Sequence, residues 1–68
     1  MDFDTCIARL TGKDAKGSYA LAQQITEESR ASDTWYSHFD EFAALLRHKN
    51  SLVRNRAISI LAANARWD

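Results

Sequence analysis

Residues 45–61 read LLRHKNSLVRNRAISIL, and this stretch decides the fold class. One apolar pattern ends at its two leucines, residues 48–50 form a polar break, and a second pattern then begins. In that second pattern Val53, Ala57 and Ile60 recur at the three-to-four-residue spacing of one helix face. The stretch therefore predicts two helices joined by a short turn.

A helix is also predicted on the N-terminal side of this turn. Its apolar stripe falls at i, i+4, i+7 and i+11 and consists of Trp35, Phe39, Phe42 and Leu46. Ser32 or Asp33 is placed to cap its start, and Asn50 or Ser51 to cap the helix that follows the turn. The second helix carries Leu61 and Asn64 on the same stripe as Val53.

The first half of the chain repeats this arrangement. One stripe consists of Phe3, Cys6, Ile7 and Leu10, and another of Tyr19, Leu21, Ala22 and Ile25. Between them Gly12 is expected to end the first helix in the left-handed conformation, and Asp14 to cap the second. Shifting the sequence by 36 positions places Phe3 on Phe39, Leu10 on Leu46 and Arg30 on Arg66.

These patterns predict an all-α domain spanning residues 1–68. We expect four helices, arranged as two stacked antiparallel helical hairpins of about 1–32 and 33–68, in a right-handed α-solenoid segment. The stripe residues Leu21, Ile25, Val53 and Leu61 should then face one another across the two hairpins.

The stretch around the second turn resembles a HEAT repeat. Leu45, Leu46, Asn50, Val53, Arg54, Ala57 and Leu61 match the positions that define such a repeat, although Lys49 stands where proline is frequent. The resemblance implies an α-solenoid whose Arg54 pairs with the turn acid of an adjacent repeat. In residues 10–25 the match is weaker, because Gly17-Ser18 replaces Val-Arg.

A narrower resemblance runs from Trp35-Tyr36 to Trp67-Asp68. It is to the N-terminal part of small bacterial HEAT-like proteins that are often labelled after the SufBD iron–sulfur assembly machinery. It implies that the chain is part of a longer solenoid. An iron–sulfur role does not follow, because the sequence shows no cluster ligands.

Composition excludes several classes of protein. The 68 residues are 46% hydrophobic and 26% charged, which is typical of a soluble globular chain rather than a disordered one. No apolar run reaches the roughly 18 residues of a membrane span, so a cytoplasmic location is expected. One cysteine precludes an internal disulfide, and a domain of this size often gains stability from oligomerisation instead.

No catalytic, metal or cofactor site is predicted. Cys6, His38 and His48 lack the spacing of metal ligands, and no local motif places a nucleophile beside a histidine. The acids of the pairs Glu27-Glu28 and Asp40-Glu41 point to different sides of a helix. We therefore expect these 68 residues not to form an enzyme. An enzyme fragment, whose chemistry lies in the remainder of a longer chain, stays open as a third hypothesis.

Two surfaces remain as candidate binding sites. Ile58, Ala62 and Ala65 form a second apolar strip, and Asn64 beside it needs hydrogen-bond partners if it is buried, one of which a following helix could supply. Trp67 either packs back on the hairpins or has lost the next repeat that covered it. For the strip and for Trp67 a missing neighbour is favoured. The favoured function is a non-catalytic interaction or scaffold module that binds a protein partner, its own copy or further repeats of the same chain. Its expected contact residues are Arg54, Arg56, Ile58, Ala62, Arg66 and Trp67.

The alternative function is nucleic-acid binding or repair. It rests on the basic residues Arg47, Lys49, Arg54, Arg56 and Arg66, with Trp35, Tyr36 and Trp67 available to stack on bases. The chain as a whole has zero net charge, so charge alone does not choose between the two functions.

Overall fold

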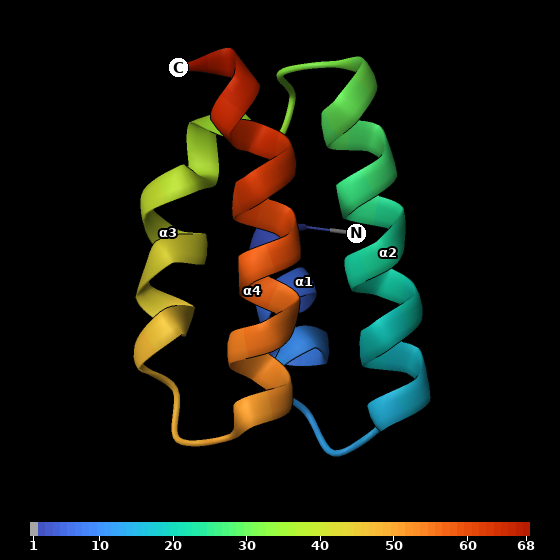
Figure 1. Ribbon diagram of the computed structural model, residues 1–68. Coiled ribbons are helices and arrows are strands. Elements are labelled where there is room, and N and C mark those ends of the chain that lie inside the picture. Colours follow the sequence, from blue (N-terminus) through green and yellow to red (C-terminus); the bar gives the residue numbers. More distant parts are fainter. Residues whose placement is uncertain (1) are drawn as a thin grey trace.

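The computed structural model describes residues 2–68, which are helical along most of their length (Figure 1). The four α-helices are α1 (Phe3–Leu10), α2 (Ala15–Ala31), α3 (Phe39–Ala44) and α4 (Ser51–Asn64). The 3₁₀ segments are η1 (Tyr36–His38), η2 (Leu45–Arg47) and η3 (Ala65–Trp67). Residues 2–68 contain no strand, so the predicted all-α class is confirmed. None of their helices combines the length and the apolar character that crossing a membrane requires.

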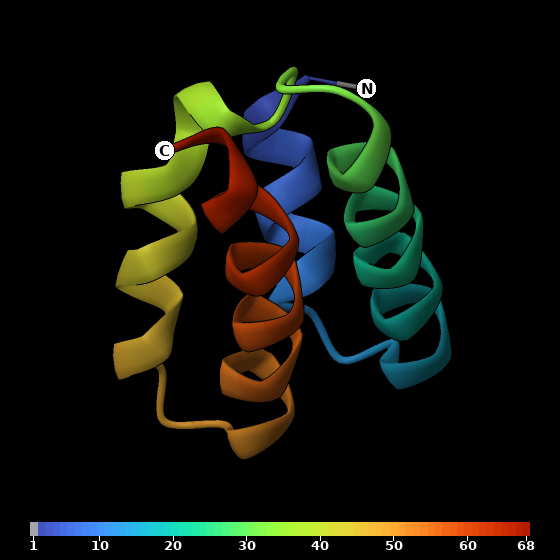
Figure 2. The ribbon, with the colours of Figure 1, turned by 45° about the horizontal axis from the view of Figure 1, so that its top comes forward.

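The helices alternate in direction along the chain (Figures 1 and 2). Helices α2 and α4 run parallel and make the most extensive contact between helices, while α1 packs on α2 and α3 packs on α4. Consecutive helices are therefore paired as hairpins, and the hairpins lie side by side in the same orientation. This alternation also places the α1–α2 turn and the α3–α4 turn at the same end of the molecule.

The core is formed by one face of each helix. Its buried apolar residues are Cys6, Leu10, Leu21, Ala22, Ile25, Phe42, Val53, Ala57 and Ile60. Phe3, Ile7, Trp35, Leu45 and Leu61 are half-buried and pack against this core. Most of the apolar stripes predicted for α1, α2 and α4 are therefore correctly assigned to the interior.

Two helix starts follow the sequence prediction. Asp14 accepts a hydrogen bond from the backbone N–H of Gly17 (3.0 Å), and Asn50 accepts one from Leu52 (2.9 Å). A Cβ atom at position 17 would collide with the carboxylate of Asp14. Gly17 thus leaves room for the side chain that caps its own helix.

The predicted left-handed glycine after α1 is wrong. No residue among 2–68 has a positive φ angle. Thr11 ends α1 instead, because its hydroxyl donates to the carbonyl of Ile7 (2.8 Å) and occupies an acceptor at the helix end. Glycine at position 12 avoids a close contact, since a Cβ atom there would lie 3.1 Å from the carbonyl oxygen of Ala8.

The predicted start of the third helix is also wrong. The hydroxyl of Ser32 accepts from the backbone N–H of Thr34 (3.1 Å) in the connection, and neither η1 nor α3 has a side-chain cap. The 3₁₀ segments on either side of α3 have three residues per turn, which shifts the stripe. Leu46 is consequently exposed, and Leu45 packs against the core in its place.

Polar contacts keep α2 and α4 in register. Asn64 is fully buried, and its Nδ2 donates to the hydroxyl of Ser29 (2.9 Å) and to the carbonyl of Ile60 (2.9 Å). Helix α2 thus supplies, through Ser29, one of the hydrogen-bond partners that Asn64 was predicted to need. The oxygen Oδ1 of Asn64 is buried without a hydrogen-bond partner.

Two isoleucines of α4 give a matched test of this packing. Ile60 is fully buried and Ile58 is 55% exposed, so the same Ile→Val change alters the same helix propensity in two environments. Ile60→Val should lower the free energy of unfolding by about 1 kcal/mol, and Ile58→Val by less than about 0.5 kcal/mol. Urea denaturation followed by circular dichroism measures both, and equal losses would contradict the assigned burial.

Candidate functional site

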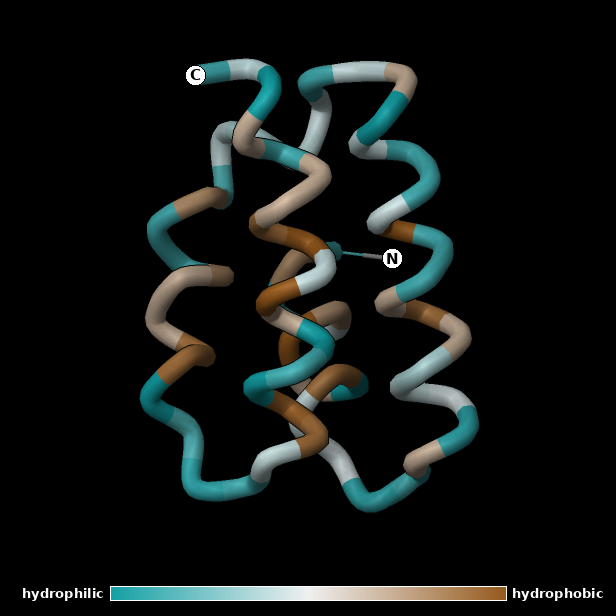
Figure 3. Tube along the Cα trace, viewed as in Figure 1, coloured by the Kyte–Doolittle hydropathy of each residue, from teal (hydrophilic) through white to brown (hydrophobic). Residues whose placement is uncertain are grey.

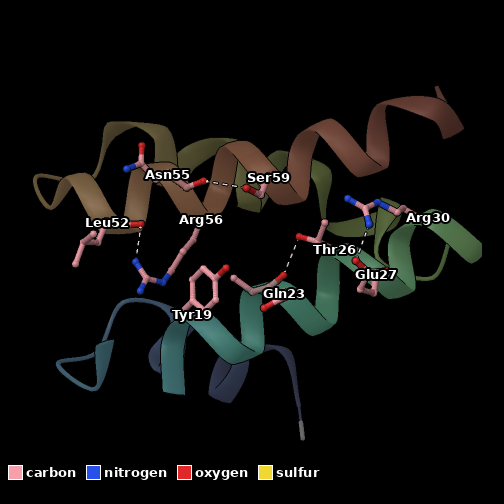
Figure 4. Close-up of a pocket in the computed structure, with 10 residues that line it drawn as sticks. Tyr19, Gln23, Thr26, Glu27, Arg30, Leu52, Asn55, Arg56 and Ser59 are labelled. Carbon is pink, nitrogen blue, oxygen red and sulfur yellow. Dashed lines mark hydrogen bonds and ion pairs between the residues drawn. The ribbon is translucent and has the colours of Figure 1, made fainter. Parts of the chain in front are cut away.

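A groove of about 410 Å³ runs between α2 and α4 (Figure 4). Helix α2 contributes Tyr19, Ala22, Gln23, Thr26, Glu27 and Arg30, and α4 contributes Leu52, Asn55, Arg56 and Ser59. Its walls thus mix aromatic, aliphatic, amide and charged groups. Tyr19 is 60% exposed and is the most accessible large apolar side chain of the groove.

Arg56 links the groove to the backbone of both hairpins. Its Nη1 donates to the carbonyl of Leu52 (2.9 Å) and its Nη2 to the carbonyl of Ala15 (2.9 Å). Its guanidinium carbon lies 5.9 Å from the centre of the Tyr19 ring, within cation–π range. The Nε atom of Arg56 is buried and has no acceptor.

Arg54 stabilises the turn of its own hairpin. Its Nη1 donates to the carbonyl of His48 (2.7 Å), and the side chain is half-buried. The HEAT resemblance implies that Arg54 pairs with a turn acid of an adjacent repeat. Among residues 2–68 its hydrogen-bond partner is the carbonyl of His48 instead. Arg54 holds the α3–α4 turn to α4.

The second apolar strip of α4 lies on the surface. Ile58 and Ala62 of α4 and Ala65 at the start of η3 are exposed, and they lie on the sides that face away from α2. One apolar side of α4 therefore packs in the core, and a second apolar side is exposed to solvent.

The residues after α4 pack back on α2. The indole nitrogen of Trp67 donates to the carbonyl of Ser29 (2.6 Å), and a guanidinium nitrogen of Arg66 donates to the carbonyl of Arg30. The guanidinium of Arg66 also lies 5.0 Å from the centre of the Trp67 ring. Of the two alternatives predicted for Trp67, packing back on the hairpins is therefore the one observed, and the side chain is half-buried.

The five basic residues between Arg47 and Arg66 do not form one site. Arg47 and Lys49 lie at the α3–α4 turn, whereas Arg66 lies beyond the opposite end of α4. The aromatic residues expected beside this block are also at the Arg66 end, where Trp35 donates to Glu28 (2.8 Å) and Tyr36 to Asp68 (3.0 Å). The sequence analysis placed Tyr19 on the apolar stripe of its helix, whereas the side chain is exposed and is the aromatic residue that lies beside Arg56.

The candidate metal and nucleophile residues lie apart. Cys6 is in the core, and burial raises the pKa of its thiol. His38 stacks on Phe3 and contacts Glu41 (2.7 Å), while His48 accepts from the backbone N–H of Asn50 (3.0 Å). Residues 2–68 contain no group of three potential metal ligands.

Comparison with known proteins adds no identification. No family model, no curated protein and no solved structure matches this chain. Its function is therefore inferred from the geometry of the chain itself.

The hydrogen bond between Trp35 and Glu28 gives a testable pH effect. This bond and a second one from Gln24 lower the pKa of Glu28 below its ordinary value of 4.5. Because the pKa of Glu28 is lower in the folded state than in the unfolded chain, ionised Glu28 stabilises the fold at pH values above the ordinary pKa of 4.5. This stabilisation is lost as the pH falls through the folded-state pKa.

Trp35→Phe keeps an aromatic ring but removes the donor. We expect the pKa of Glu28, measured by NMR titration of its side-chain carbonyl carbon, to rise toward 4.5 in this variant. The pKa of Asp2, which its hydrogen bonds from Thr5 lower, serves as the internal control. An unchanged pKa of Glu28 would contradict the bond.

Proposed function

We propose that this protein is a non-catalytic helical interaction module, which packs an uncovered face of α4 against an apolar helix surface of a second molecule. The observation that carries the proposal is the exposed strip of Ile58, Ala62 and Ala65 on the sides of α4 that face away from α2. A side chain such as Ile58 gains free energy when another surface removes it from water.

Both hairpins expose charged groups, but α4 adds the exposed side chain of Ile58. Exposed positions of α1 and α2 carry Asp4, Arg9, Lys16, Gln24 and Glu28, so the first hairpin presents charged and amide groups to solvent. In stacked-repeat proteins a polar outer face is typical of a terminal unit, and an apolar face is typical of a unit that receives a neighbour. Helix α4 fits the second description.

Small alanine side chains support close approach of a helix. Ala62 and Ala65 flank Ile58 on the helix surface. Their side chains are small, so a second helix can approach the backbone near them. The second molecule in the proposal is a helical surface with apolar side chains, either in another copy of this chain or in a different protein.

Self-association can be measured directly. Sedimentation velocity over a range of concentrations should show species larger than the 7.7 kDa chain for the wild type. Ile58→Asp should shift the population to the monomer without changing the circular dichroism spectrum, because the residue contributes little to the core.

Ala20→Asp is the matched control, since position 20 is an exposed alanine of α2 on the other hairpin. It introduces the same charge and should leave the assembly unchanged. A chain that stays monomeric at every concentration would contradict pairing with its own copy, and the proposal would then require a different protein. Equal effects of the two substitutions would contradict the role of the α4 strip.

A further inference from the structure

The charged residues of this neutral chain separate toward opposite ends of the helices. Because the helices alternate in direction, the α1–α2 turn and the α3–α4 turn lie at one end, which we call the turn end (Figure 1). Figure 3 shows that the α3–α4 turn is hydrophilic. The basic residues in or next to the two turns are Arg9, Lys13, Lys16, Arg47, Lys49, Arg54 and Arg56.

Acidic residues collect away from the turn end. Among residues 2–68, Asp14 is the only acid at the turn end, and its carboxylate caps α2. The other acids lie at the starts of α1 and α3, in the last two turns of α2, in the connection after α2 and at residue 68. Of the basic residues, Arg30 and Arg66 alone lie with them. The net charge of the chain is zero, but the turn end is strongly positive and the opposite end is strongly negative.

A cavity of about 240 Å³ lies between the two turns. Gly12 and Lys13 from the first turn and Asn50 and Leu52 from the second line it, together with Arg56. None of its lining residues carries a carboxylate. The cavity therefore offers cationic and amide donors with no internal anion to neutralise them.

The guanidinium of Arg56 is held in a fixed position at the cavity. Its Nη1 and Nη2 donate to backbone carbonyls, which fixes the guanidinium plane, and its buried Nε has no acceptor. Its positive charge adds to that of Lys13, which lines the same cavity. The planar guanidinium suits phosphate oxygens well.

An exposed aromatic ring adjoins this cationic cavity. Leu52 and Arg56 line both the cavity and the α2–α4 groove, so the two spaces share a wall. Tyr19, which is 60% exposed, lies in the groove with its ring beside the guanidinium of Arg56 (Figure 4). Proteins that bind single strands combine cations that follow the phosphates with aromatic rings that stack on unpaired bases.

We propose that the turn end and Tyr19 form a binding site for single-stranded nucleic acid. Phosphate groups lie between Lys13, Arg56 and Lys49, and an unpaired base stacks on Tyr19. This site differs from the block between Arg47 and Arg66, because it excludes Arg66 and includes basic residues of the first hairpin. It does not involve the apolar strip of α4, so it stands independently of the interaction proposed above.

Fluorescence anisotropy with a labelled single-stranded DNA of mixed sequence tests the site on the full chain. The wild type should bind, and the affinity should fall steeply as salt is raised. Lys13→Ala combined with Lys49→Ala, both at exposed positions, should weaken binding about tenfold or more. The double substitution should also lower the salt slope by about 0.7 for each phosphate that the protein no longer neutralises.

Two controls distinguish binding at this site from non-specific attraction to positive charge and from a loss of folding. Arg66→Ala removes one positive charge from the opposite end and should change binding less than about twofold, whereas Lys13→Ala alone should weaken binding about threefold or more. Tyr19→Ala should weaken binding at least about fivefold while leaving the salt slope unchanged, whereas Tyr19→Phe should bind like the wild type.

Four results with nucleic acid would overturn the proposal. They are no binding at low salt, equal losses of affinity from Arg66→Ala and Lys13→Ala, no effect of Tyr19→Ala, and binding of duplex DNA as tight as that of the single strand. Equal binding of poly-glutamate would also overturn it, because an acidic polypeptide provides charge without bases that stack.

Discussion

The parallel contact between α2 and α4 is the interaction on which the rest of the structure depends. Helix α1 is attached mainly through α2, and α3 through α4, so the two hairpins are joined where these two helices meet. Leu21, Ala22 and Ile25 of α2 and Ala57 and Ile60 of α4 are buried, and the removal of their apolar surface from water provides most of the stabilisation. Apolar contact alone permits sliding, and the buried hydrogen bond from Asn64 to Ser29 adds a polar constraint on the register.

The same contact explains why the internal repeat is visible in the sequence. The hydrogen bonds that join the ends of α2 and α4 connect residues 35, 36 and 38 positions apart, at Ser29–Asn64, Arg30–Arg66 and Ser29–Trp67. These separations are close to the shift of 36 positions that aligns the two halves of the chain. Helices of equivalent hairpins that lie parallel bring equivalent positions together, and the interhelical bonds therefore repeat the period of the sequence.

Helical spacing predicted the core well where the helices are regular. The buried residues of α1, α2 and α4 are nearly those of the predicted stripes, because a regular helix keeps one face toward its neighbour over several turns. The third helix was predicted less well, since 3₁₀ segments flank α3 and move the buried position from Leu46 to Leu45. Gly12 was misassigned because Thr11 already satisfies the end of α1 through its side chain, which spacing alone does not reveal.

The candidate sites depended more on the tertiary arrangement than on local patterns. The strip of Ile58, Ala62 and Ala65 was predictable because it lies on one helix, whereas Lys13 and Arg56 come together only when both turns lie at one end. Trp67 looked uncovered in the sequence, yet Ser29 provides a carbonyl acceptor for its indole on the neighbouring helix. Residues near different turns combine into one surface because the chain alternates in direction, and the order of charges along the sequence does not show this.

The most direct test of this account is the distance between Ser29 and Asn64 in solution. Parallel stacking of α2 on α4 predicts strong nuclear Overhauser effects between the side-chain amide protons of Asn64 and the β-protons of Ser29, whose Oγ lies 2.9 Å from Nδ2. The amide protons should also exchange slowly with solvent, because Asn64 is fully buried. Absence of these effects in a chain whose helices are otherwise formed would contradict the stacked arrangement of the two hairpins.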